Sequence, residues 1–169
     1  MVTDRLTTRV AALRRTFVVA LLVWLVVGTV QVYPFYLPYF NELVGGPGNG
    51  YRYLTDSALD WGQDLKGLRT YLHRNGIAMV QLAYFGKIDP RAYGIVYERL
   101  VPGQPTTGYI AVSATKLMGL SSYPGDPDCV RAFEWLQRYQ PIAKIGYSIF
   151  VYHISPTESL PPAISLPGC

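Results

Sequence analysis

The chain has 169 residues, of which half are apolar and 14% are aromatic. This composition excludes a largely disordered chain and is sufficient to build the core of one domain of ordinary size. The formal net charge of +4 does not indicate a nucleic-acid-binding surface, because the basic excess lies before the first apolar run and the rest of the chain is nearly neutral. The residues that carry this excess are Arg5, Arg9, Arg14 and Arg15.

The N-terminal region has the pattern of a membrane anchor. Residues 1–15 form a basic arm, and residues 16–37 are predicted to form a transmembrane helix that contains the uncharged run FVVALLVWLVVGTV. About 20 apolar residues are enough to cross a hydrocarbon core of about 30 Å. The positive-inside rule then predicts that the arm is cytoplasmic and that everything after Pro34 is extracytoplasmic, which in a bacterium means the periplasmic side of the inner membrane.

A cleaved signal peptide is the competing interpretation, because it also has a basic start and an apolar middle. We favour the anchor, since the bulky sequence VQVYPFYLPYF offers no small-x-small cleavage site. Aromatic side chains near the end of the span are typical of the membrane interface. We therefore expect an interaction surface whose aromatic residues are Trp24, Tyr33, Tyr36, Tyr39 and, beyond the span, Trp61.

The exported part begins with a Gly/Pro-rich connector at residues 38–55, and an α/β domain is predicted over residues 56–155. Helical spacing of Trp61, Leu65, Leu68 and Leu72 predicts a helix that starts at an Asp60 cap and stops before Asn75-Gly76. The apolar run at residues 79–85 predicts a buried strand. The remaining expected elements are a short helix from Asp89-Pro90 to Tyr93, strands at 95–100 and 109–113, a helix at 126–139, and two strands flanking Gly146-Tyr147.

This order of elements favours a small α/β sandwich with a mixed sheet, parallel in part and closed by a C-terminal β-hairpin with a two-residue turn. The proline-rich tail at residues 156–169 is expected to be extended.

The densest polar segment is DSALDWGQD, in which Asp56, Asp60 and Asp64 are spaced by four residues. If all three were helical, their carboxylates would line one face and could hold a hard cation such as Ca²⁺ or Mg²⁺, or supply a general base. The simpler interpretation is structural, because acidic residues favour turns and helix N-termini. We favour the structural interpretation and keep the three aspartates as candidate metal ligands.

Other patterns point away from catalysis. His73 and His153 pair with no credible nucleophile in the sequence, and no GxSxG elbow is present. The glycines of GGPGNG fit neither GxGxxG nor GxxxxGK[ST], so a turn-rich connector is the better interpretation, and no cofactor is expected. Cys129 and Cys169 could form a disulfide, or Cys129 could be a buried apolar residue. The many aromatic residues could provide a platform for a sugar, although they are more often core or interface.

One resemblance is specific. The run YLPYFNELVGGPGNGYRYLTDSALDWGQDLKGLRTYL resembles the C-terminal end of bacterial family-39-type membrane glycosyltransferases, which are related to protein mannosyltransferases. The likeness continues through LAYFGKIDPRAYGI, GYIAVSATKLMGL and IGYSIFVYHI, and covers about 120 residues. In that family, the multi-span N-terminal half carries the catalytic carboxylates and uses a lipid-linked sugar. That half is not in this sequence, so the resemblance implies no catalytic residue here.

The leading hypothesis is therefore a non-catalytic, single-span accessory subunit that docks onto other integral membrane subunits, with a respiratory or photosynthetic assembly as one suitable host. The alternative is the detached C-terminal domain of a split glycosyltransferase that uses a lipid-linked sugar. A weaker alternative is a saccharide- or cation-binding module.

Overall fold

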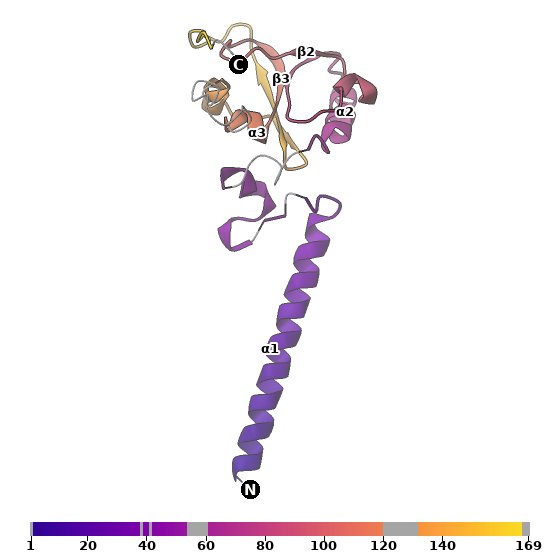
Figure 1. Ribbon diagram of the computed structural model, residues 1–169, viewed down its shortest axis with the longest axis vertical. Helices are drawn as coiled ribbons and strands as arrows, with labels where there is room; N and C mark the ends of the chain where they lie inside the picture. The colour runs from indigo at the N-terminus through magenta and orange to yellow at the C-terminus, as the bar shows by residue number, and fades with distance from the viewer. Residues whose placement is uncertain (1, 38, 41, 54–60, 120–131, 167–169) are drawn as a thin grey trace. The chain divides into compact units, whose positions relative to one another are not determined.

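The computed structural model describes residues 2–37, 39–40, 42–53, 61–119 and 132–166. It divides into two compact units, residues 1–36 and residues 37–169. The first unit is one helix, α1 (Val2–Val32), followed by a short turn (Figure 1). The helix includes the basic arm as well as the apolar run, so it begins well before the predicted start of the span at residue 16 and ends just ahead of Pro34.

The second unit is built on a five-stranded mixed sheet with strand order β2-β1-β3-β5-β4. Strand β1 is parallel to both β2 and β3, and β5 is antiparallel to both β3 and β4. The predicted α/β class with a mixed sheet is confirmed. The strands are β1 (Val80–Ala83), β2 (Tyr97–Arg99), β3 (Gly108–Ser113), β4 (Ala143–Ile145) and β5 (Ile149–Ile154).

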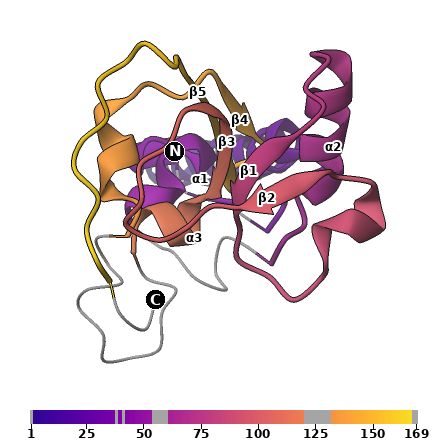
Figure 2. The same cartoon turned by 90° about the horizontal axis from the view of Figure 1, so that it is seen from above.

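Both faces of the sheet are covered. On one face, α2 (Leu65–Arg74) buries Leu65, Leu68 and Leu72 against apolar side chains of β1, β3 and β5. On the other face lie α3 (Ala114–Leu117) and the 3-10 helix η6 (Glu134–Arg138), as the view from above shows (Figure 2). Alternate residues of β3 and β5 enter the two cores, as the two-residue period of a strand requires.

The predicted helix at residues 60–75 is shorter in the structure, where α2 starts at Leu65. Gly62 has a φ of +80°, so residues 61–64 turn before the helix begins. Trp61 consequently lies ahead of the helix and is 57% exposed, so its predicted place in the helix was wrong. The predicted helix at 126–139 falls partly outside the described residues, and its described end is the 3-10 helix η6.

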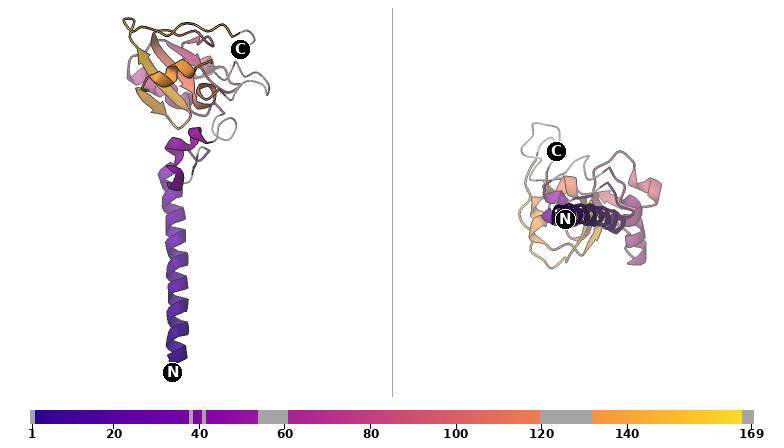
Figure 3. Two further views of the ribbon diagram at one scale, coloured as in Figure 1. Left: turned by 90° about the vertical axis from the view of Figure 1, so that its left-hand side faces the viewer. Right: turned by 90° about the horizontal axis from the view of Figure 1, so that it is seen from below.

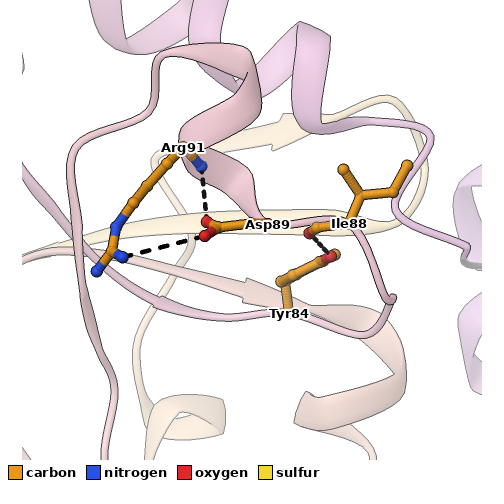
Figure 4. Close-up of polar contacts among 4 residues, drawn as sticks. All are labelled: Tyr84, Ile88, Asp89 and Arg91. Atoms are coloured by element: carbon orange, nitrogen blue, oxygen red, sulfur yellow. Dashed lines mark hydrogen bonds and ion pairs between the residues drawn. The ribbon is translucent and has the colours of Figure 1, made fainter.

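The short helix after Asp89 is confirmed as the 3-10 helix η4 (Pro90–Tyr93). Asp89 caps it by accepting a hydrogen bond of 2.9 Å from the Arg91 backbone N–H, and the Arg91 guanidinium lies 4.0 Å from the same carboxylate (Figure 4). Beside this cap, the Tyr84 hydroxyl donates to the Ile88 carbonyl. The two contacts fix the loop between β1 and η4.

The segment after β5 contains no helix or strand in its described part, residues 155–166, and packs along the outside of the domain (Figure 3). Ile164 donates a backbone hydrogen bond of 2.8 Å to the Gly103 carbonyl. Leu160 and Leu166 pack against the core on the η6 face of the sheet. The tail therefore completes the cover of that face.

Candidate functional site

Asp64 is the one member of the predicted aspartate series within the described residues, because Asp56 and Asp60 lie outside them. It occupies the cap position of α2 but makes no capping hydrogen bond, and it is only 2% exposed. Its Oδ2 atom accepts hydrogen bonds from the Tyr147 N–H (3.2 Å), the Ser148 N–H (3.2 Å) and the Ser148 hydroxyl (2.8 Å). The carboxylate thus holds the three-residue connection, Gly146 to Ser148, that joins β4 to β5.

The surroundings of Asp64 indicate a structural carboxylate. Burial raises its pKa above the ordinary value, and the hydrogen bonds from Ser148 and Tyr147 oppose that shift. Oδ2 accepts hydrogen bonds from three donors of the chain itself, so this side of the carboxylate is directed inward. No cluster of three or more potential metal-binding side chains occurs among the described residues.

The neighbouring residues of the DWGQD motif also have local roles. The Gln63 Oε1 atom accepts a hydrogen bond of 2.7 Å from the Trp61 backbone N–H, which closes the turn before α2. A Cβ at Gly62 would press against the Tyr84 ring, so the missing side chain lets the turn approach β1. The described part of the motif therefore joins α2 to the sheet at two places.

A cleft of about 360 Å³ opens on the sheet face that η6 covers. It brings together residues that are far apart in the sequence, and sequence reasoning did not find it. Its aromatic wall is formed by Tyr51 of the 3-10 helix η2 (Pro47–Arg52), Tyr139 after η6, and Phe150 and Tyr152 of β5. Its polar lining includes Arg52, Gln137 and Gln140. The abundance of tyrosine was the one signal in the sequence that pointed to such a platform.

Lys144 of β4 connects η2 to the sheet, next to the aromatic wall of the cleft. Its ammonium lies 4.5 Å from the Tyr51 ring centroid and 5.0 Å from that of Phe150, and it donates a hydrogen bond of 2.5 Å to the Gly48 carbonyl. Burial, assisted by the nearby charge of Arg52, lowers the Lys144 pKa to about 8. The cation–π contacts favour the charged form, but they do not compensate for its desolvation.

The lowered pKa of Lys144 makes the stability of the domain depend on pH. Between about pH 8 and about pH 10.5, the unfolded chain keeps the proton that the folded chain has released. Because the unfolded state then binds more protons, we expect the free energy of unfolding to rise with pH across this window. Denaturant titrations of the full chain at a series of pH values measure this slope.

Lys144→Met keeps the aliphatic contacts and should remove most of the rise, whereas Lys87→Met, at an exposed lysine, should leave it unchanged. Lys116, whose pKa is also lowered by burial, should contribute a slope of the same sign that remains in this variant. A rise of the same size in Lys144→Met and in the unaltered chain would contradict this assignment.

A second cleft, of about 570 Å³, lies between α2 and η4. Lys66, Arg69 and Thr70 line it from the helix, and Tyr93 and Gly94 line it from the end of η4. The Thr70 hydroxyl donates to the Lys66 carbonyl within the helix, and Lys66 and Arg69 are the charged side chains of this lining. The arrangement is a basic surface groove with no carboxylate in its described lining.

The predicted interaction residues are all exposed. Trp24 is 56% exposed on α1, and Tyr33 and Tyr36 make an edge-to-face contact with ring centroids 6.1 Å apart. Tyr39, in the second unit, donates a 3.4 Å hydrogen bond to Glu42. The cysteine pair Cys129 and Cys169 lies outside the described residues.

Comparison with models of protein families, with curated proteins and with solved structures gave no match for this chain. The resemblance to family-39-type glycosyltransferases therefore stays a prediction from the sequence.

Proposed function

We propose that this chain is a non-catalytic accessory subunit of a membrane protein complex, anchored by α1 and carrying its second unit on the extracytoplasmic side. The observation that supports this most strongly is the surface of α1. Within Arg9–Val32, an 18-residue window has a mean hydropathy of 2.1, and no residue of that window is buried inside the structure. A helix that is apolar all round needs lipid or other helices to cover it.

A signal sequence near the N-terminus is also long and apolar enough to resemble such a span, so the two roles are separated by experiment. In the anchor role, the arginines at the start of α1 stay in the cytoplasm and the sheet domain is exported. Tyr33 and Tyr36 then face lipid headgroups or neighbouring spans, and Trp24, which is central in the span, faces lipid tails or neighbouring spans. Such residues are enriched both at membrane interfaces and at protein interfaces.

The inward direction of Asp64 supports a non-catalytic role for the domain. A general base must reach the proton that it removes, and the Asp64 Oδ2 atom is instead saturated by Tyr147 and Ser148. The alternative is the detached C-terminal domain of a split glycosyltransferase, which the sequence resemblance favours. In that case, the partner supplies the catalytic carboxylates.

The side-chain specificity of α1 provides the test. A variant in which residues 17–30 are all leucine keeps an apolar span of the same length but loses the native packing surface. After mild detergent extraction, we expect the unaltered chain to migrate on native gels in an assembly far larger than its own 18.9 kDa. The leucine variant should remain in the membrane fraction and migrate without partners.

Each other result has a defined meaning. Removal of α1 from the mature protein, read from its intact mass, would establish a signal sequence and contradict the anchor. Migration of the unaltered chain as a monomer would contradict the accessory role. Co-migration with a multi-span glycosyltransferase, identified by mass spectrometry, would favour the split enzyme. An intact assembly in the leucine variant would show that α1 does not dock by its side chains.

A further inference from the structure

The aromatic cleft at Tyr51 and Tyr152 has the features of a binding site that the accessory role does not require. Its volume of about 360 Å³ falls within the range of small-molecule sites, about 300–1,000 Å³. Its walls come from η2, α3, η6 and β5, which are held in place by the core. The cleft is therefore formed by packed elements and not by a single loop.

Tyr152 supplies an unused hydrogen-bonding group in this cleft. Its side chain is only 3% exposed yet lines the cleft, and no hydrogen bond to its hydroxyl occurs within the part of the chain that the structure describes. Burial, together with the neighbouring Tyr51, raises the Tyr152 pKa to about 12, so the hydroxyl keeps its proton and can donate. The Tyr152 hydroxyl is not among the fully buried, unpaired polar atoms of the described residues, so it reaches the solvent of the cleft, where a ligand oxygen can replace water as its acceptor.

The charge beside the cleft is positive. Arg52 lines it, with its guanidinium 5.7 Å from the Tyr51 ring centroid and its Nε donating to the Tyr51 hydroxyl at 3.3 Å. The Lys144 ammonium lies on the same ring at 4.5 Å. Neither cation is paired with a carboxylate among the described residues. Two cations beside one aromatic ring, with no carboxylate partner among the described residues, favour an anion at this place.

The shape of the wall indicates which kind of anion fits. The rings of Tyr51 and Phe150 meet edge to face, at 68° and 5.0 Å between centroids. They do not form the two parallel plates that would enclose a flat nucleobase. The lining instead includes three tyrosines, Gln137 and Gln140, and the Gln137 amide also donates to the Leu117 carbonyl. Distributed donors and acceptors beside a single aromatic face match a ring that carries many hydroxyl groups.

We infer that this cleft binds an acidic saccharide, meaning a sugar that carries a carboxylate or a phosphate. The sugar ring lies against the aromatic wall, the Tyr152 hydroxyl donates to a ring or hydroxyl oxygen, and the anionic group lies toward Arg52. This role is independent of the proposed assembly, because the cleft lies within the second unit and none of its lining comes from α1.

Calorimetric titration of the full chain in phosphatidylcholine nanodiscs tests the inference. Digalacturonate is the probe, its dimethyl ester is the neutral match, and glucose 6-phosphate represents the phosphate arm. We expect saturable binding of one or both acidic sugars, and binding of the ester weaker by about tenfold or more, as the loss of one charge-assisted contact predicts. Added salt should weaken the binding of the acidic sugars and should leave the binding of the ester unchanged.

Two conservative variants assign the contacts. Tyr152→Phe removes only the hydroxyl and should weaken the binding of both acidic and neutral sugars by about fivefold to tenfold. Arg52→Gln should remove the preference for the acidic sugar. Arg69→Gln, in the basic groove at α2, is the matched control and should bind as the unaltered chain does. Circular dichroism melting curves confirm that each variant is folded.

Four results would overturn the inference. These are equal affinity for digalacturonate and its ester, tighter binding of adenosine monophosphate than of either acidic sugar, full affinity in Tyr152→Phe, and no saturable binding of any acidic sugar at millimolar concentration. If inorganic phosphate alone competed as well as glucose 6-phosphate, the site would be an anion site without sugar recognition, and the inference would also fail.

Discussion

Replacement of Asp64 by alanine is expected to lower the free energy of unfolding of the sheet domain by about 3 kcal/mol. The change leaves the N–H groups of Tyr147 and Ser148 and the Ser148 hydroxyl without their acceptor. Ser148 is fully buried, so water cannot replace the carboxylate without opening the domain. Each such unsatisfied donor costs about 1–3 kcal/mol, and relief from burying a charge offsets part of the total.

Chemical denaturation of the full chain in detergent micelles measures this loss, with near-ultraviolet circular dichroism as the signal of tertiary structure. Asp89→Ala is the matched control, because Asp89 is an exposed aspartate that caps η4 through a single backbone N–H (Figure 4). Its loss should cost about 1 kcal/mol or less. Asp64→Asn keeps one oxygen acceptor and should fall between the two. A loss in Asp64→Ala no larger than in Asp89→Ala would refute the structural role.

The elements that the sequence predicted correctly are those whose signals are local. The apolar run at residues 79–85 contains β1, and the Asp-Pro pair at residues 89–90 opens η4 with the expected cap. Such patterns depend on neighbours within a few residues, so the sequence alone carries them. The predicted start of α2 was wrong because the true start depends on a contact with a residue that is distant in the sequence. Gly62 adopts a positive φ beneath the Tyr84 ring, and that contact is made by a residue 22 positions away.

The candidate site also depends on contacts between residues that are distant in the sequence. The four-residue spacing of the aspartates suggested a common helical face, but Asp64 lies ahead of the helix and turns toward residues 147 and 148, more than 80 positions along the chain. The aromatic cleft likewise combines Tyr51 with Phe150 and Tyr152. Neither arrangement leaves a periodic pattern in the sequence, because each brings together residues that are far apart along the chain.

Gly146→Ala is expected to be the second strongly destabilising change, and its cost should depend on Asp64. Gly146 has a φ of +54°, and an added Cβ would overlap the Asp64 carboxylate. The left-handed conformation alone costs about 1–2 kcal/mol for a residue with a Cβ. Displacing a buried, hydrogen-bonded carboxylate adds to that cost, because Asp64 cannot rotate away without losing Tyr147 and Ser148.

A double-mutant cycle separates the two contributions. Gly76→Ala supplies the conformational cost alone, since Gly76 has a φ of +64° and no atom within 4 Å of an added Cβ. In the Asp64→Ala background, the overlap is gone, and Gly146→Ala should cost no more than Gly76→Ala. The double variant should therefore lose less stability than the two single changes added together, with a coupling in the range of about 0.5–3 kcal/mol. If the two losses of stability were strictly additive, the Cβ added at position 146 would not overlap the Asp64 carboxylate. The contact between the start of α2 and the β4–β5 connection would then not depend on their close fit.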